Sequence, residues 1–303
     1  SEASAAEDNA QSTTVDPIGY PTTLASVTSP SYKAKIDEWL VELVNSANDD
    51  DGFQNPGLGG TPAEGEEGGL LGSRLLDEHG LELKQMIEKG SFGAALYNHA
   101  LTVVNGDLSD PAAIDKLVEI CGTNPSFNPD QAAAAAKYAG RRSKHNSESG
   151  FFYDIKNSLI TARAAIEAGD EFNEVRDQAL ADYLLAWEKA NFATVIYYCN
   201  AAKTKLQQAA GDEAIQGDAL HSYGEGVAFA SGFKGISNKQ ITDAQIDGIL
   251  ELLLAPEGEA PESYRLLNDA SLLSNLDQVI GEIQSIYGFT DDQVASFYVN
   301  NPE

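Results

Sequence analysis

Apolar residues recur every three or four positions along most of the chain, the spacing that gathers them on one face of an α-helix. The longest such pattern lies between Glu171 and Asp212, and its apolar positions are Phe172, Val175, Ala179, Leu184, Trp187, Val195, Tyr198, Ala202 and Leu206. Polar residues separate them, so the pattern predicts one helix of about eleven turns, unless it is broken once. The strand formers TVIYY lie inside this segment, but no turn residues bound them, which favours the helix.

The same spacing predicts further helices in segments 31–47, 73–106, 110–121, 129–148, 154–169, 220–233, 241–255 and 262–288. Segment 73–106 contains Gly90, where a break is an open alternative. Two capping boxes, Thr242 with Gln245 and Thr290 with Gln293, mark helix starts near the C-terminus. Because the local signals agree with the periodicity, the predicted fold is all-α with negligible strand.

Two segments lack this periodicity. Residues 1–28 are mostly small, polar and acidic, which predicts a flexible acidic tether, with an ordinary frayed terminus as the alternative. Residues 48–69 are rich in glycine, proline and acidic side chains and predict a long loop. Within it, Asp49, Asp50 and Asp51 offer the oxygen ligands that Ca²⁺ prefers, but their spacing does not match a helix-loop-helix calcium loop. A solvated acidic loop is therefore favoured over a calcium site.

The charge balance narrows the classes of partner. The chain carries 47 acidic and 19 basic residues, a formal net charge of −28. Such a surface disfavours nucleic acid and anionic membranes, and favours a cation, a basic partner or a salty medium. No apolar run reaches the length of about 18 residues that a membrane-spanning helix needs, so we expect no transmembrane segment.

The N-terminal sequence favours export. The chain begins without an initiator Met, and residues 1–28 have the composition of a tether. In exported proteins such a tether links a cleaved or lipid-modified N-terminus to the folded body, which predicts a processed N-terminus and a lipid anchor upstream of residue 1. The Cys that would carry the lipid is absent from this sequence.

Neither the cysteines nor the common catalytic motifs identify a reaction or a metal site in this sequence. Cys121 and Cys199 are the two cysteines of the chain, and they form neither a CxxC motif nor a zinc-finger spacing. The two cysteines have two alternative states, which are one disulfide in an oxidising compartment or two free thiols in the core. The chain has no HExxH, GxSxG or GxxxxGK[ST] motif, which removes the common zinc-protease, hydrolase and nucleotide-binding classes.

Two of the four histidines lie close to a glutamate at helical spacing. His145 precedes Glu148 by three residues in KHNSESGFFYDI, and His221 precedes Glu225 by four in LHSYGEGVAFAS. Glycine and aromatic residues follow each pair, which indicates a weak internal repeat with one copy in each half of the chain. A neutral imidazole and a carboxylate can bind Zn²⁺ or Fe, or the carboxylate can orient the imidazole as a general base.

If the fold brings both pairs together, His145, Glu148, His221 and Glu225 form a metal site with two histidine and two glutamate ligands. The alternative is that each pair makes a hydrogen bond that satisfies a half-buried histidine and fixes helix packing.

Five blocks of sequence, in order, carry a family resemblance: GLELKQMIEKGSFGAALYNHAL, KHNSESGFFYDI, WEKANFATVIYYCNAA, LHSYGEGVAFASGF and NKQITDAQIDGILELLL. Over residues 31–300 the chain resembles the exported bacterial family known as domain of unknown function 4856, which is related to the imelysin-like proteins. The resemblance implies an all-helical domain at 29–303, made of two bundle-like halves at about 29–169 and 170–303. It also implies export to the periplasm or cell surface, often as a lipoprotein, and a link to the acquisition of iron or another metal.

The resemblance gives weaker support to an enzymatic activity. The imelysin-like proteins were once classed as metallopeptidases because of a GxHxxE motif. Here His145 and Glu148 match the HxxE part of that motif, but Ser143 stands where its glycine should be.

Three functions follow as hypotheses. The first is an exported, non-enzymatic protein that binds a metal ion, a metal complex or a partner protein in an envelope uptake system. The second is a metal-dependent hydrolase of the imelysin type that uses the His and Glu pairs. The third is a structural or adhesion module that uses the acidic surface.

Overall fold

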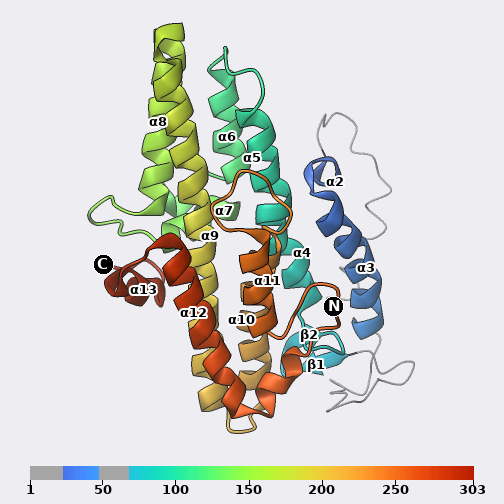
Figure 1. Ribbon diagram of the computed structural model, residues 1–303. Coiled ribbons are helices and arrows are strands. Elements are labelled where there is room, and N and C mark those ends of the chain that lie inside the picture. The colour runs from blue at the N-terminus through green and yellow to red at the C-terminus, as the bar shows by residue number, and fades with distance from the viewer. Residues whose placement is uncertain (1–22, 48–67) are drawn as a thin grey trace.

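The computed structural model describes residues 23–47 and 68–303, and helices make up nearly all of its regular structure (Figure 1). Helix accounts for 70% and strand for 3%, so the all-α prediction is confirmed. The helices are α2 (Leu24–Val27), α3 (Pro30–Ala47), α4 (Leu83–Ser91), α5 (Asn98–Val104), α6 (Ala112–Cys121), α7 (Ala134–Arg141), α8 (Phe151–Ala168), α9 (Asn173–Ala209), α10 (Glu213–Ser231), α11 (Asp243–Leu252), α12 (Leu273–Tyr287) and α13 (Asp291–Phe297).

Helix α9 is the central element of the fold. It runs for 37 residues without a break, as its sequence pattern predicts. Helices α8, α10 and α12 pack along it (Figure 1). The side chains of Trp187, Phe192 and Ile196 on α9 are at most 2% exposed. Packing on several sides buries most of the TVIYY stretch, and this tertiary burial outweighs the strand preference of those residues.

Helices α4 and α10 approach each other closely at a pair of glycines. A Cβ atom added to Gly232, just after α10, would overlap the carbonyl oxygen of Gly90 on α4. A Cβ atom added to Gly90 would in turn overlap the hydroxyl of Tyr32 on α3. A larger side chain at either position would therefore separate the helices, and the two glycines fix how the polar side chains of α4 face α10.

The predicted helix at 73–106 is wrong over its first ten residues. There the chain forms an antiparallel hairpin of β1 (Gly69–Leu71) and β2 (Arg74–Leu76), in which Leu71 pairs with Arg74. Gly72 in the turn has φ 61°, a conformation that favours glycine in two-residue hairpin turns. The leucine pairs of this hairpin fit a helix as well as a strand, so the glycine in the turn decides between the two structures. The helix then runs through Gly90 and continues into a π-helical segment, Phe92–Tyr97.

The predicted helix at 129–148 is also too long. Only Ala134–Arg141 is α-helical, after a 3₁₀ turn at Pro129–Gln131. Beyond α7, Lys144 and Ser149 form an isolated antiparallel bridge. The bridge closes a loop over HNSE, residues that favour turns and side-chain hydrogen bonds over helix interior positions.

The predicted helix at 262–288 begins late for a similar reason. Two 3₁₀ turns, Ser263–Leu267 and Ala270–Leu272, come first. The side chain of Asp269 accepts a hydrogen bond from the backbone N–H of Ser271 at 3.0 Å, which satisfies a turn rather than a longer helix.

Both predicted capping boxes are confirmed. The Thr242 hydroxyl accepts from the Gln245 backbone N–H at 3.2 Å, and the Gln245 side chain accepts from the Thr242 N–H at 2.9 Å. The Thr290 and Gln293 pair has the same two bonds. Each box satisfies N–H groups that have no partner within the helix.

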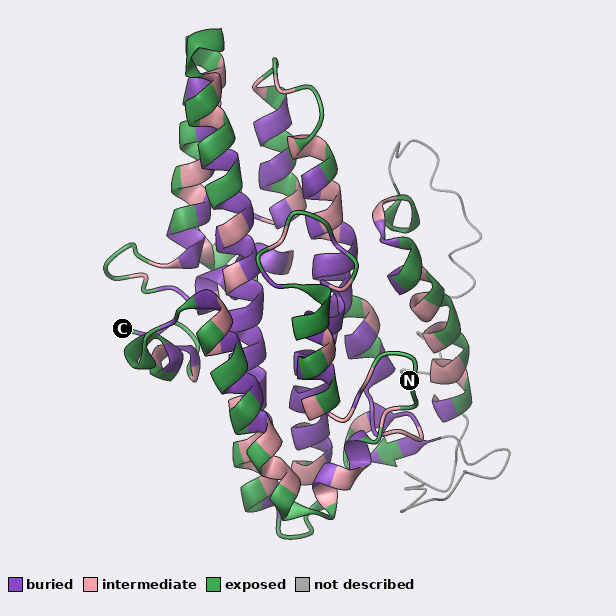
Figure 2. Cartoon of the chain, viewed as in Figure 1, coloured by how far each residue is buried: buried purple, intermediate pink, exposed green. Residues whose placement is uncertain are grey.

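One hydrophobic core runs through the molecule, and its buried residues line the facing sides of the helices (Figure 2). It joins Leu117 of α6 and Leu159 of α8 to Val227 of α10 and Ile283 of α12. The two predicted halves, on either side of residues 169 and 170, therefore share this core.

The remaining predictions of the sequence have mixed outcomes. Cys121 and Cys199 are free and buried, so the core-thiol alternative is correct. Burial raises the pKa of both thiols, as expected of unreactive core cysteines. The acidic loop with its three aspartates lies in 48–67, outside the described residues. Residues 1–22 also lie outside them, and the last part of the predicted tether forms the short helix α2.

Candidate functional site

His145 and Glu148 lie in the loop between α7 and α8 rather than on a helix. The ring Nε2 of His145 lies 2.9 Å from the carbonyl oxygen of Gly140. Glu148 has φ 46° and a side chain that is 70% exposed, with Oε2 3.6 Å from Nζ of Lys156. The Glu148 backbone N–H donates to the His145 carbonyl at 3.3 Å, so the HxxE spacing forms a turn. The two side chains have separate partners.

His221 lies on α10 and has a stronger partner than the glutamate predicted for it. Its Nδ1 lies 2.6 Å from Oε2 of Glu82, the residue that precedes the first turn of α4. The predicted partner, Glu225, lies one turn along α10, with Oε2 3.7 Å from the other ring nitrogen, Nε2. The imidazole therefore lies between two carboxylates that are 3% and 5% exposed.

The surroundings of Glu82 favour its ionised form. Burial opposes ionisation of Glu82, but the hydrogen bond and charge of His221, with help from Gln85 and Arg74, hold its pKa below the ordinary value. The ionised Glu82 carboxylate accepts a hydrogen bond from Nδ1–H of His221. The other ring nitrogen, Nε2, faces Glu225.

Lys89 neutralises Glu225 on its other side. Its Nζ lies 3.6 Å from Glu225 Oε1 and 2.5 Å from Glu88 Oε1. The ammonium also lies over the rings of Phe92 and Tyr138, at 5.8 and 5.6 Å from their centroids. Burial lowers the pKa of Lys89, but the neighbouring carboxylates outweigh it and leave the pKa raised. Lys89 is therefore a buried, permanent cation.

Arg74 attaches the hairpin to the same group of charges. Its Nη2 lies 2.7 Å from Oδ1 of Asp218 on α10, and its Nη1 lies 3.3 Å from Nδ1 of His221. We call this set the His221 cluster. Its members are Arg74, Glu82, Lys89, Asp218, His221 and Glu225.

The His221 cluster contains two chemical arrangements of interest. Glu82 orients the His221 ring as a carboxylate orients a general base, and Nε2 with Glu225 offers two donors to a cation. Lys89 and Arg74, however, supply cations on both sides, so the carboxylates already have positive partners within the protein. No group of three or more His, Cys, Asp or Glu side chains in residues 23–47 and 68–303 is arranged to hold a metal ion.

The structure does not bring the two predicted pairs to one point. Among the described residues, no hydrogen bond or ion pair joins His145 or Glu148 to the His221 cluster. The expected Zn or Fe site of His145, Glu148, His221 and Glu225 therefore stays a prediction, without a shared centre.

The weak internal repeat also differs between its copies. Gly150 precedes α8 with φ 101°, a conformation that favours glycine. Gly226 lies inside α10, where an added Cβ would lie 3.4 Å from Cβ of Tyr198 on α9. The first glycine serves a turn, whereas a Cβ at the second would make only an ordinary van der Waals contact, so the two glycines do not share a structural role.

Sequence reasoning missed Glu82 and Lys89. They lie far from His221 in sequence, and only the packing of α4 on α10 brings them together. One signal was available, because Glu82, Gln85 and Lys89 recur at spacings of three and four residues, which place them on one face of a helix.

The other two histidines lie elsewhere. His79 Nε2 lies 3.2 Å from Glu78 Oε1, and the adjacent Asp77 is 5% exposed. Burial raises the pKa of Asp77 to about 7, although it accepts the backbone N–H groups of His79 and Leu81. Half-buried His99 has a lowered pKa, because burial and the charge of Lys116 disfavour its cation.

A groove of about 740 Å³ lies between α6 and α8. Its apolar wall consists of Ile114 and Val118 from α6 and Leu159 and Ile160 from α8. The loop after α6 closes one side with Phe127. Charged side chains form the rim, and these are Asp115, Glu119, Lys156 and Arg163.

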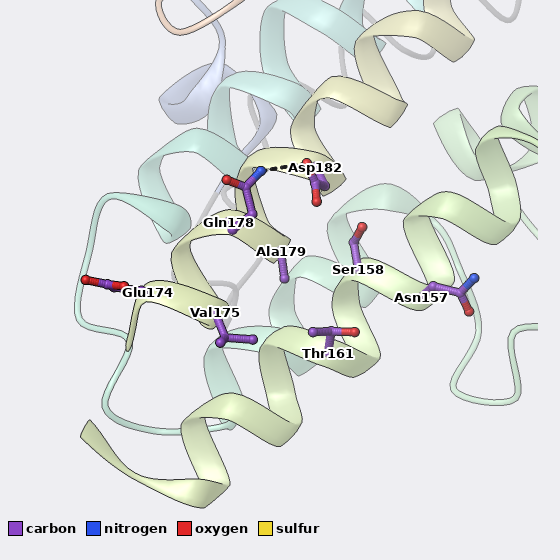
Figure 3. Close-up of a pocket in the computed structure, with 8 residues that line it drawn as sticks. All are labelled: Asn157, Ser158, Thr161, Glu174, Val175, Gln178, Ala179 and Asp182. Atoms are coloured by element: carbon purple, nitrogen blue, oxygen red, sulfur yellow. Dashed lines mark hydrogen bonds between the residues drawn. The ribbon is translucent and has the colours of Figure 1, made fainter. Parts of the chain in front are cut away.

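A second groove follows the contact of α8 with α9 and has a different lining. Figure 3 shows its lining residues on the two helices, among them Ser158 and Thr161 of α8 and Gln178 and Asp182 of α9, which are joined by a hydrogen bond. Its volume is about 490 Å³. Six of its eight lining residues are polar in type, but the surface that they present to the groove is mostly apolar, so its smaller volume rather than its polarity distinguishes it from the α6–α8 groove.

A third cavity, of about 320 Å³, lies between α3, α10 and the segment 255–261. The His221 cluster lines none of these three spaces. The buried charges and the ligand-sized cavities are therefore separate features of the molecule.

No family model, curated protein or solved structure matches this chain. Within residues 23–47 and 68–303, none of the helices combines the length and the apolar character that crossing a membrane requires. The geometry of the cluster and the cavities is therefore the basis for a functional assignment.

Proposed function

We propose that this protein is a non-enzymatic binding protein that takes an amphipathic organic molecule in the groove between α6 and α8. The observation that best supports this proposal is the groove itself, whose volume of about 740 Å³ falls within the range of about 300–1,000 Å³ typical of ligand sites. It is larger than the α8–α9 groove and the third cavity.

The lining supports an organic ligand. Ile114, Val118 and Leu159 are less than 10% exposed and form an apolar wall that is continuous with the core. Ile160 is 49% exposed at the mouth of the groove, where it extends the apolar wall toward solvent. Contact with an apolar ligand would remove this surface from water.

The rim supports a polar end on the same ligand. Arg163 Nη1 lies 2.5 Å from Asp115 Oδ1, so an ion pair joins α8 to α6 across the groove. Lys156 and Glu119 lie on the rim beside it. These four charges can orient a polar group while the apolar part lies against the wall.

The His221 cluster supports binding over hydrolysis. A metal-dependent hydrolase needs ligands that converge and an open position for water. Here Glu82 and Glu225 are paired with His221 and Lys89 inside the protein. The cluster is better suited to holding α4 and α10 in place than to activating water.

The family resemblance adds finer proposals. It supports export behind a tethered N-terminus, two imelysin-like bundle halves and a role in acquiring iron or another metal. A metal chelate with an organic shell has the mixed apolar and charged character of the groove. Metal analysis of protein purified without chelators, before and after a His221→Ala change, tests whether metal binds alone.

The binding proposal can be tested with N-phenyl-1-naphthylamine, an uncharged dye that fluoresces in apolar surroundings. We expect saturable binding, and at least about tenfold weaker binding to an Ile160→Arg variant, because a charge replaces apolar wall at the mouth. Val41→Arg is the matched control, since Val41 is an exposed aliphatic residue on α3 and lines none of the three spaces. Equal binding to both variants would contradict the proposal.

A further inference from the structure

The third cavity has a deep apolar floor. It lies under the segment 255–261, between α3, α10 and α11. Its floor consists of side chains that are at most 2% exposed, and these are Leu81, Met86, Val227 and Leu250. Such a floor favours alkyl groups, and the buried hydroxyl beside it, from Ser231, donates to the carbonyl oxygen of Ala228 at 3.3 Å.

An aromatic wall stands beside this floor. The half-buried Trp39 of α3 lines the cavity and packs edge to face against Tyr32, with ring centroids 5.4 Å apart. This contact limits rotation of the indole ring. Tryptophan is the aromatic side chain that attracts organic cations most strongly.

The mouth of the cavity is acidic. Three carboxylates line it, from Glu38, Glu257 and Glu259, against a single ammonium from Lys35. Lys35 Nζ lies 2.6 Å from Glu257 Oε2 and ties α3 to the segment 255–261. Within the described part of the chain, Glu38 and Glu259 form no ion pair, so the mouth keeps an excess of negative charge.

We propose that this cavity binds a small organic cation of the alkylammonium class. The apolar floor takes the alkyl groups, the indole of Trp39 attracts the positive charge, and the carboxylates at the mouth add to that attraction. An anion would meet the acidic mouth, and a bare metal ion would meet the apolar floor. This site is separate from the α6–α8 groove and goes beyond the function proposed for it.

The chain is well suited to a direct test, because it has two tryptophans and Trp187 is 2% exposed in the core. Titration with choline should therefore change the fluorescence of Trp39 in a saturable manner. The uncharged isostere 3,3-dimethyl-1-butanol should bind about tenfold more weakly, because it lacks the cation. Equal affinity for the two compounds, or no saturable change with choline, would overturn the proposal.

Two substitutions at the mouth should act in opposite directions, with affinity followed by calorimetry. Glu257→Gln removes a carboxylate and should weaken choline binding several-fold, whereas Lys35→Gln removes the competing ammonium and should strengthen it. Both side chains lie at the surface, so the fold should remain intact. Glu282→Gln, at an exposed position on α12, is the control and should leave binding unchanged. Effects of the same sign at Lys35 and Glu257 would contradict the assigned site, whatever the dye shows at the α6–α8 groove.

Discussion

The Nδ1 atom of His221 lies 2.6 Å from Oε2 of Glu82, across 139 positions of the chain. This contact joins α10 to the start of α4 inside the protein. It gives the buried Glu82 carboxylate a hydrogen-bond donor, and it gives the His221 ring a fixed orientation. Glu82 and His221 thereby satisfy each other without an added ligand.

Removing Glu82 should therefore destabilise the fold. Glu82→Ala leaves His221 and Arg74 without this carboxylate, and we expect the free energy of unfolding to fall by about 2–4 kcal/mol in urea at pH 7. Its contribution should be present above the unfolded pKa near 4.5 and disappear as pH falls through the lower folded pKa. Glu282→Ala on the exposed face of α12 should change stability by less than about 0.5 kcal/mol. A similar loss in both variants would contradict this role.

Asp77 should have the opposite pH dependence. Because its folded pKa is raised from 3.8 to about 7, the native state binds more protons than the unfolded state between these values. Stability is therefore lost as pH rises through this window, and the cost is complete above it.

Asp77→Asn keeps an oxygen that can accept from Leu81 N–H, at 2.7 Å in the native protein, and removes the buried charge. We expect the variant to be about 1–3 kcal/mol more stable than the native protein at pH 8, and close to it at pH 4. Chemical denaturation at the two pH values measures this difference. An equal effect at both would show that Asp77 does not titrate in this range.

Substitution of Glu188, a buried carboxylate on α9, should strongly destabilise the fold. Its Oε2 accepts from the backbone N–H of Gln240, and its Oε1 accepts from Ile241 N–H, both at 2.8 Å. The hydroxyl of Tyr287 donates to the same Oε1 at 2.7 Å. Glu188 thus holds the segment before α11 and the end of α12 against the central helix.

Glu188→Ala leaves three donors without an acceptor, two of them in buried hydrogen bonds, and we expect a loss of about 3–5 kcal/mol in the free energy of unfolding. Glu188→Gln retains one acceptor oxygen and should lose about half as much. Thermal unfolding followed by calorimetry would reveal the order. If the two substitutions cost the same, the hydrogen bonds at the retained oxygen contribute little.

The acidic surface should make stability depend on salt. With a formal charge of −28, exposed carboxylates repel one another, and screening acts over about 10 Å at 0.1 M salt. The melting temperature should rise when sodium chloride increases from about 0.02 to 0.5 M at constant pH. A flat or falling melting temperature would show that surface repulsion is not a significant cost.

The sequence predicted those parts of the fold that local interactions determine. The apolar spacing over α9 and the boxes at Thr242 and Thr290 are patterns that can be recognised from residues within a few positions of each other. The hairpin at β1 and β2 was missed because its leucine pairs also fit a helix, while the turn depends on the conformation of Gly72. Periodicity alone does not separate these two structures.

The candidate site was predictable only in part, for a related reason. Helical spacing correctly placed Glu225 near His221, with 3.7 Å between Oε2 and Nε2. It gave no information on Glu82 or Lys89, whose positions depend on packing between helices. At His145 a turn after α7 replaces the expected helix, so the spacing of three residues does not place Glu148 on the same helix face as His145.

The central claim is that the α6–α8 groove is a ligand site, and a crystal structure of the protein with bound N-phenyl-1-naphthylamine tests it most directly. The account predicts density for the aromatic rings between Val118 and Leu159, against the walls of the groove. Density confined to the α8–α9 groove or to the cavity beside Trp39, with the α6–α8 groove empty, would contradict it.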